Sequence, residues 1–321
     1  MTALPRVLAA ALALTALAVP GARAQDAAPP SPSSLVEEVQ IIARLPGPAL
    51  WRISTPNSQL WILGVAGPLP RNFAWDSRRV AAALTGAREL ITPPSASLNP
   101  KEIFGLMLDR GHVLHMPKGE TLRGDLAPPL RARFEAAARA VGQDPAHYDH
   151  WRAVVASIAL VFDAESRDHL DKTGSLRTVG DLARRYNVRT RHLADYKAGE
   201  LIRGWSQVPP EATAACVTLA VVMVERLPQD APDMARAWAK GDLATVKAID
   251  EATSTDACFA AAPAVGALQE RVAKDWARDL RRVLAQPGKT VVEIDLPSLT
   301  RKGGLLDQLR AEGLDVIGPA Y

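Results

Sequence analysis

Apolar residues recur along the chain with two different spacings, and each spacing predicts a different kind of element. Short runs of apolar and β-branched residues, typical of strands, occur at residues 49–54, 59–64, 89–92, 289–295 and 314–318. Apolar residues at helical spacing occur at residues 76–85, 101–109, 128–141, 151–164, 178–186, 210–226, 230–240, 243–251, 268–284 and 305–311. Residues 187–193 alternate weakly and are compatible with a further strand.

The predicted strands lie near both ends of the chain, whereas helical patterns fill the middle. The first two strands are separated only by Thr55-Pro56-Asn57-Ser58, which predicts a hairpin. A helix and a third strand follow, an order typical of an α/β layer arrangement. We therefore predict an α/β (α+β) fold with a mixed central sheet built from both chain ends and a large helical insert at about residues 100–285.

Residues 59–70 combine an apolar strand with a turn rich in glycine and proline. Gly64 and Gly67 lie three residues apart, and Pro68 and Pro70 follow them. The end of a buried strand in an α/β fold commonly carries functional groups. Between Gly64 and Pro70, however, there is no His, Cys, Asp, Glu, Ser or Lys. This turn has the position of a site without the side chains that a site needs.

The first 24 residues have the three parts of a secretory signal peptide. Arg6 supplies a positive charge, residues 7–19 form a short apolar core, and Ala22-Arg23-Ala24 is an A-x-A cleavage site. A membrane-spanning helix needs about 20 apolar residues, and neither this core nor any later run reaches that length. We predict a signal peptide at 1–24, a flexible lead-in at 25–45 and a single domain at 46–321, without a transmembrane anchor and exported to a bacterial periplasm.

Charge excludes one class of partner. Removal of residues 1–24 takes away Arg6 and Arg23 and no acidic residue, so the formal net charge falls from +3 to +1. Nucleic-acid binding needs a basic face, and the nearly balanced chain predicts no nucleic-acid partner. Nothing in the sequence names another partner or an oligomeric state.

Two cysteines, Cys216 and Cys258, lie in the part of the chain that follows the signal peptide. In an oxidising compartment an isolated pair indicates a disulfide, and here it would join two helices of the middle region. The alternative is two free thiols buried as small apolar side chains. The predicted export favours the disulfide.

Several local patterns follow one another in a characteristic order. They are Pro48-Ala49-Leu50-Trp51-Arg52-Ile53-Ser54 with the strand ending at Leu63-Gly64, then Ala237-Trp238-Ala239-Lys240-Gly241-Asp242-Leu243, then Glu270-Arg271 and Trp276 with Pro287-Gly288-Lys289-Thr290-Val291-Val292, and finally Gly304-Leu305-Leu306 with Gly313-Leu314-Asp315-Val316. Together these patterns resemble the TraB/GumN family over most of the chain. The resemblance implies a fold similar to that of haem-binding ChaN and erythromycin-esterase-like proteins, and its Tiki branch implies metal-dependent peptide hydrolysis.

The sequence departs from the family at each place where a site residue is expected. The resemblance implies a Gly-x-x-His after the second strand, a Glu at the end of the third and another Gly-x-x-His after the late strand. Here Gly64 is kept but Gly67 stands at the His, Pro93 stands at the Glu, and Asp295 and Ser298 stand at the second Gly and His. Glycine and proline offer no side-chain ligand, and one Asp cannot hold a catalytic metal. We predict no metal and no cofactor.

Other chemistry-bearing residues have ordinary structural explanations. His112 and His115, in an apparent loop or strand, and His147 and His150, at a helix entrance, have H-x-x-H spacing without the acidic neighbour of H-E-x-x-H, which favours structural roles over a metal site. Ser298 lacks the surroundings of a nucleophile elbow, and Asp295 is better placed to cap the following turn. The tryptophans, Trp51, Trp61, Trp75, Trp151, Trp205, Trp238 and Trp276, are expected in the core rather than along a ligand groove.

Two hypotheses follow from these residues. The first is an exported, non-catalytic protein that has kept the scaffold and binds a ligand or partner. The second is a hydrolase with a relocated site that uses Asp295, Ser298 or the His112/His115 pair.

Overall fold

A computed structural model describes residues 47–205, 208–253, 258 and 263–321. The chain divides into two units, Met1–Ile42 and Ala43–Tyr321, and every described residue belongs to the second. The predicted signal peptide and lead-in therefore lie outside the described residues. Within the described part of the chain, no helix is long and apolar enough to cross a membrane.

A mixed sheet organises the described unit, as predicted. In spatial order its strands are β10 (Val316–Ile317), β1 (Leu50–Ser54), β2 (Ser58–Val65), β9 (Gly288–Asp295), β4 (Glu89–Thr92) and β7 (Arg189–His192). β2, β9, β4 and β7 run parallel to one another, and β1 and β10 extend the sheet with antiparallel pairing. Both ends of the chain thus supply strands, and the predicted insert adds β7 at one edge.

The predicted hairpin is present, and its second strand is the centre of the sheet. β1 and β2 pair from Leu50↔Leu63 to Ser54↔Gln59, and β2 pairs in parallel with all eight residues of β9. Parallel strands covered on both faces are apolar along their whole length. This requirement explains the apolar run of residues 60–65 in β2 and the apolar Val291, Val292 and Ile294 in β9, between which Glu293 is the exception.

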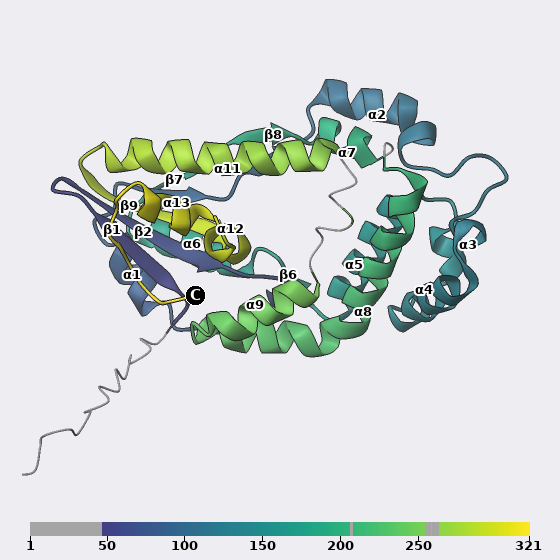
Figure 1. Ribbon diagram of the computed structural model, residues 1–321, viewed down its shortest axis with the longest axis horizontal. Coiled ribbons are helices and arrows are strands. Elements are labelled where there is room, and N and C mark those ends of the chain that lie inside the picture. The colour runs from purple at the N-terminus through teal and green to yellow at the C-terminus, as the bar shows by residue number, and fades with distance from the viewer. Residues whose placement is uncertain (1–46, 206–207, 254–257, 259–262) are drawn as a thin grey trace, which may run out of the picture. The chain divides into compact units, whose positions relative to one another are not determined.

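Helices cover both faces of the sheet (Figure 1). One face packs against α11 (Pro263–Leu284), α12 (Leu296–Thr300), α13 (Leu305–Ala311) and the end of α8 (Pro210–Ala239). The other face packs against α1 (Arg78–Leu84) and α6 (Gly174–Arg185). The arrangement is a three-layer α/β core in which Trp51, Trp238 and Trp276 are fully buried, as expected for core tryptophans. The side chain of Trp205 lies outside the description.

The insert has an apolar core of its own. α4 (Pro128–Ala140) and α5 (Ala153–Arg167) pack with the first part of α8, and their apolar stripes include Phe134, Leu160 and Val221. The end of α8 carries Met234 and Trp238 into the core beneath the sheet. One helix therefore ties the insert to the sheet.

The sequence predicts two helices, 210–226 and 230–240, where the structure has the single helix α8. Pro228 and Pro232 lie inside this helix. A proline removes one backbone hydrogen bond and is the usual site of a sharp helix kink. Figure 1 shows α8 changing direction along its length. The prolines interrupt the pattern without ending the helix, because apolar residues on both sides of them are buried in the two cores.

The remaining elements connect these layers. They are β3 (Leu69–Pro70), β5 (Ser95–Ser97), α2 (Pro100–Val113), α3 (Leu122–Asp125), η1 (Pro145–Tyr148), β6 (Leu170–Asp171), β8 (Asp195–Lys197), α7 (Ala198–Trp205) and α9 (Leu243–Ala252). β3 pairs with β6 and β5 pairs with β8, in two small sheets. These two-residue and three-residue strands are too short to produce a periodic pattern in the sequence.

Cys216 and Cys258 are joined as predicted, with their sulfur atoms 1.99 Å apart. Cys216 lies on α8 and Cys258 follows α9. Both are buried beside Val154 of α5. The bond fastens the segment after α9 to the core of the insert.

Candidate functional site

A cleft of about 700 Å³ opens where β2 and β9 end. The two strands are parallel neighbours, so their carboxyl ends meet at the same edge of the sheet. Gly67 and Pro68 follow β2, Asp295 ends β9, and Leu296 to Ser298 follow it; all of them line the cleft. The carboxyl edge of an open α/β sheet is where ligands usually bind. The turn that the sequence singles out therefore faces a cleft.

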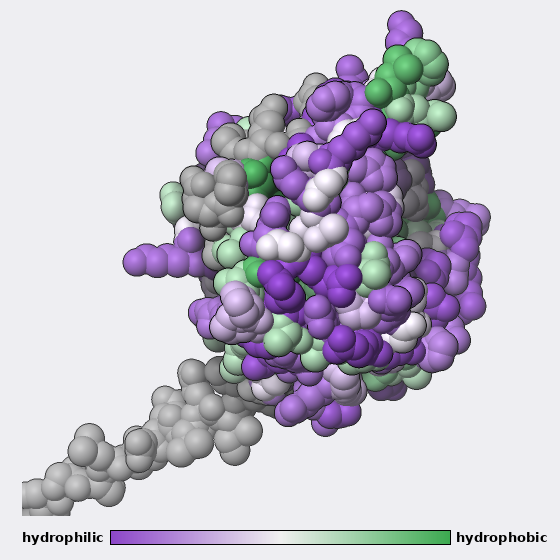
Figure 2. All heavy atoms as spheres, turned by 90° about the vertical axis from the view of Figure 1, so that its right-hand side faces the viewer, coloured by the Kyte–Doolittle hydropathy of each residue, from purple (hydrophilic) through white to green (hydrophobic). Residues whose placement is uncertain are grey.

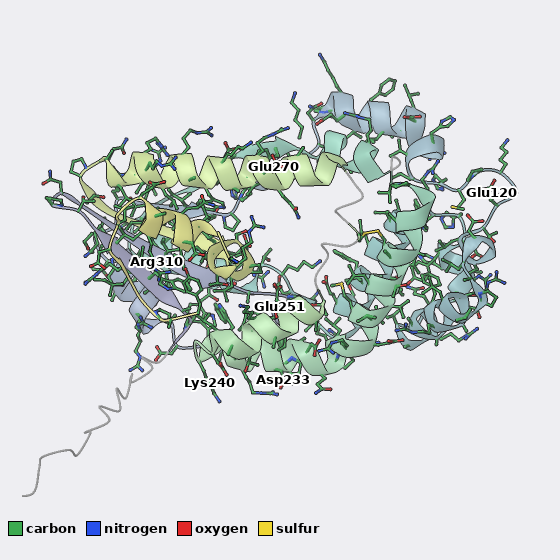
Figure 3. All side chains as sticks on the ribbon, viewed as in Figure 1. Glu120, Asp233, Lys240, Glu251, Glu270 and Arg310 are labelled. Atoms are coloured by element: carbon green, nitrogen blue, oxygen red, sulfur yellow. A yellow bond between two sulfur atoms is a disulfide. The ribbon has the colours of Figure 1, made fainter. Side chains whose placement is uncertain are left out.

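Three groups of helices form the walls of this cleft, and most of the side chains that they contribute are apolar. α8 and α9 supply one wall, α11 a second, and α12 with α13 the third. In Figure 3 the labels Glu251 and Glu270 mark α9 and α11, which border the cleft on two sides. Apolar side chains from each wall include Leu227, Met234, Ile249, Val272, Trp276 and Leu305. Such a lining suits an apolar ligand.

Gly64 is needed because the backbone and two side chains meet at this point. A Cβ atom there would come 2.3 Å from Cδ2 of Leu296 and 3.0 Å from the ring of Trp51. The carbonyl oxygen of Gly64 accepts a hydrogen bond of 2.8 Å from Nε1 of Trp238. Gly67 differs, since a Cβ there would meet nothing closer than the carbonyl oxygen of Lys172 at 3.5 Å. Gly64 is required by packing, whereas Gly67 leaves space open.

Asp295 caps the turn after β9, as the sequence indicates. Its Oδ2 accepts a hydrogen bond of 2.9 Å from the backbone N–H of Ser298, at the start of α12. This is the ordinary role of Asp before a helix. The carboxylate is therefore engaged in capping α12 beside the cleft.

Two pairs of oppositely charged side chains lie at the cleft. Asp230 accepts a hydrogen bond of 2.8 Å from Nε of Arg226, and Nζ of Lys247 lies 4.0 Å from Glu251. Both pairs are one helical turn apart, a spacing that brings side chains together. Within each pair the charges compensate one another, and apolar side chains form most of the helical lining.

Pro93 and the predicted histidine pairs lie away from this lining. Pro93 follows β4, and its carbonyl oxygen is 3.2 Å from Nδ1 of His192 on β7. His112 belongs to the last turn of α2, not to a loop or strand, and its Nδ1 lies 3.2 Å from Asp109. α2 begins at a capping box formed by Asn99 and Glu102, and it extends past the predicted end to Val113, which is buried. The cleft thus brings together Gly67, Asp295 and Ser298 without Pro93.

The two histidine motifs meet each other in the fold. His115 stacks on Trp151 with ring centroids 4.7 Å apart and lies 5.6 Å from His150, which is 6.4 Å from His147. Burial lowers the pKa of His150, and the charges of His115 and His147 lower it further. The sequence does not reveal this cluster, because the bridge between His115 and Trp151 is a tertiary contact.

Glu293 is a buried acid that sequence reasoning missed. It lies in the middle of β9, is fully buried, and neither carboxylate oxygen accepts a hydrogen bond from a described residue. Val292 and Ile294 face the core with α11, so alternation turns Glu293 toward α1 and α6, on the opposite side of the sheet from α11. Burial raises its pKa well above the ordinary value. The sequence feature that could have indicated a buried acid is the position of Glu293 inside the β-branched run 288–295.

The side chains at the strand ends do not suit a metal. Among the described residues, no group of three His, Cys, Asp or Glu side chains is close enough to hold a metal ion. Gly67 has no side chain, and the carboxylate of Asp295 is engaged with the backbone of Ser298. A catalytic zinc ion ordinarily takes three protein ligands. The residues around the cleft do not fit the metal that the family resemblance implies.

The fold and the site define an α/β protein with a helical insert and an apolar cleft at the carboxyl edge of its sheet. A family model described as the TraB/PrgY/gumN family matches residues 49–317, and the chain belongs to this family. The match runs from the first strand of the sheet to its last. No curated protein and no solved structure matches the chain.

Proposed function

We propose that this TraB family protein is exported and binds an apolar ligand or partner segment in the cleft, without metal-dependent catalysis. The observation that carries the proposal is the lining at the strand ends. Gly67 and Ser298 stand where the family resemblance implies ligands, while apolar side chains from three walls converge on the same space. The scaffold around them is intact, since Trp238 still holds the carbonyl group of Gly64.

Export is supported by two independent features. The first 24 residues have the pattern of a signal peptide, and Cys216 and Cys258 lie at disulfide distance. Disulfides persist in oxidising compartments such as the bacterial periplasm. Mass spectrometry of the protein secreted by its host should find Gln25 at the mature N-terminus.

A hydrolase with a relocated site is the weaker proposal. His112 is paired with Asp109 on α2, and His115 is stacked on Trp151, so neither lines the cleft. Ser298 lines it, but none of the described histidines does. A serine nucleophile needs a base within hydrogen-bonding distance.

Titration with the apolar fluorophore N-phenyl-1-naphthylamine tests the proposed binding. We expect saturable binding of one molecule, which Val272→Asp weakens by at least about tenfold because it places an unpaired charge in the apolar lining. Ile249→Asp should weaken it for the same reason, since this half-buried residue lines the cleft from α9. Val155→Asp is the matched control, a half-buried valine on α5 outside the cleft.

Equal affinity for the wild type and both cleft variants would overturn the proposal. Far-ultraviolet circular dichroism of each variant checks that the fold is kept. Binding that Val155→Asp weakens as much as Val272→Asp would also count against the cleft.

A further inference from the structure

Helix α2 exposes an apolar face that nothing in the described chain covers. Four large apolar residues of this helix are exposed: Ile103 by 44 %, Phe104 by 64 %, Met107 by 63 % and Leu108 by 73 %. Figure 2 shows a mainly hydrophilic face with a hydrophobic projection at its upper edge, at the level of α2 in Figure 1. Apolar side chains gathered on one helix differ from the scattered exposed residues of ordinary surfaces.

The four side chains form one continuous stripe. Residues three and four apart on a helix are neighbours, so Ile103 lies beside Met107, and Phe104 lies beside both Met107 and Leu108. With 3.6 residues per turn, the stripe covers about 140° of the helix circumference. This is the width that an amphipathic helix presents to an apolar phase.

The opposite face of α2 fixes the helix to the protein. Leu106 and Val113 are buried, and α7 packs against this side. At the end of the helix, Nε of Arg152 donates a hydrogen bond of 2.8 Å to the carbonyl oxygen of His112. The exposed stripe is thus presented by an anchored helix with a second, buried apolar face.

The basic side chains of α2 border the stripe, whereas its acidic side chains lie on the opposite face. The helical spacing places Lys101 at one border of the stripe, beside Leu108, and Arg110 at the other, beside Ile103. Both cations are exposed, and neither forms an ion pair with a described residue. The acids of the helix, Glu102 and Asp109, lie on the far side.

We propose that α2 is a membrane-surface helix, which inserts its apolar stripe into the interface of a bilayer that carries anionic headgroups. Lys101 and Arg110 flank the stripe as snorkelling side chains whose charges reach the phosphate groups. A second copy of the chain is a poorer occupant, because two such stripes would bring cations together with no acid at the border. Charge complementarity therefore selects the anionic lipid surface.

Co-sedimentation of the full-length mature protein with vesicles tests this proposal. The vesicles contain phosphatidylglycerol and phosphatidylcholine, and pure phosphatidylcholine vesicles are the comparison. We expect the wild type to sediment with the anionic vesicles. The double variant Phe104→Ser/Leu108→Ser should bind at least about tenfold more weakly, because it removes two large apolar side chains from the lipid. Lys101→Gln/Arg110→Gln should lose about thirtyfold on anionic vesicles alone, about fivefold for each cation.

Phe162→Ser is the matched control, because Phe162 on α5 is 62 % exposed and lies on another helix. This variant should bind as the wild type does. The proposal fails if the wild type does not sediment with anionic vesicles, or if Phe104→Ser/Leu108→Ser binds them equally well. It also fails if sedimentation equilibrium shows a dimer that this double variant dissociates.

Discussion

The indole nitrogen of Trp238 donates a buried hydrogen bond of 2.8 Å to the carbonyl oxygen of Gly64. The two residues are 174 positions apart, one near the end of α8 and the other near the end of β2. A buried carbonyl group needs a partner, and the indole supplies it where the strand leaves the sheet. The contact fixes the insert to the end of β2, just before Gly67 and Pro68 at the cleft.

Trp238→Phe should therefore lower the free energy of unfolding by about 1–3 kcal/mol, since it leaves the Gly64 carbonyl group buried and unpaired. Urea denaturation measures the change. Trp61→Phe is the control, because Nε1 of Trp61 bonds only to Oε1 of Gln59 at a half-exposed position. A loss as large in Trp61→Phe would contradict the role given to the Gly64 contact.

Gly64, near the end of β2, and Gly67, in the turn that follows, should respond differently to the same substitution. Gly64→Ala pushes a methyl group against Leu296 and Trp51, and overpacking of this kind costs about 1–3 kcal/mol. Gly67→Ala meets only an ordinary contact and should change stability by less than about 0.5 kcal/mol. Thermal unfolding of both variants provides the comparison. Equal destabilisation would show that Gly67 also has a packing role.

Glu293 should make the protein less stable as the pH rises. Its pKa in the folded state is raised above the ordinary value of 4.5, so the folded state keeps a proton that the unfolded state has lost. The free energy of unfolding then falls by up to about 1.4 kcal/mol per pH unit between the two pKa values. Glu293→Gln removes this loss, so the variant should be more stable than the wild type at pH 8 and lose its advantage near pH 4.

Urea denaturation at several pH values, with Glu120→Gln as an exposed control, checks this expectation. Glu120 is on the surface, so its substitution should leave the pH profile unchanged. A wild type and Glu293→Gln variant with parallel profiles would mean that Glu293 is ionised or partnered in the folded protein.

The disulfide should stabilise the folded protein, because it restricts the conformations of the unfolded chain. Cys216 and Cys258 are 42 residues apart, and a loop of this size corresponds to at most about 4 kcal/mol of loop-closure entropy. Cys216→Ser/Cys258→Ser should lower the free energy of unfolding by up to that amount under oxidising conditions. With a reducing agent present throughout, the wild type should approach the variant. A variant as stable as the oxidised wild type would contradict the stabilising role.

Much of the fold could be predicted from the sequence because its core elements have strong local patterns. β4 and α13 occur at the predicted residues, and β9 differs from its predicted run by one residue. The β-branched run of β9 is buried on both faces, and α13 places Leu305, Leu306 and Leu309 in the core. Elements that are buried to this extent have a strong apolar pattern, and their bounds can be predicted from it.

Other features depended on contacts that no local pattern carries. α8 continues through Pro228 because its two halves are buried in different cores. Glu293 resembles an exposed acid in the sequence, and only the sheet order shows that β9 lies between β2 and β4. The candidate site was predictable at Gly67, Asp295 and Ser298, which lie at or just after the ends of adjacent parallel strands. Two of its three helical walls, α8 with α9 and α11, belong to the insert, and no local pattern shows that they approach these strand ends.

The metal content of the purified mature protein tests the absence of metal chemistry at the cleft most directly. After incubation with Mn²⁺, Co²⁺ or Zn²⁺ and extensive dialysis, elemental analysis should find far less than one equivalent of metal, equal in the wild type and in Asp295→Asn. One tightly held equivalent that is lost in Asp295→Asn, or in His112→Ala/His115→Ala, would contradict the proposal and would favour the alternative, a hydrolase with a relocated site.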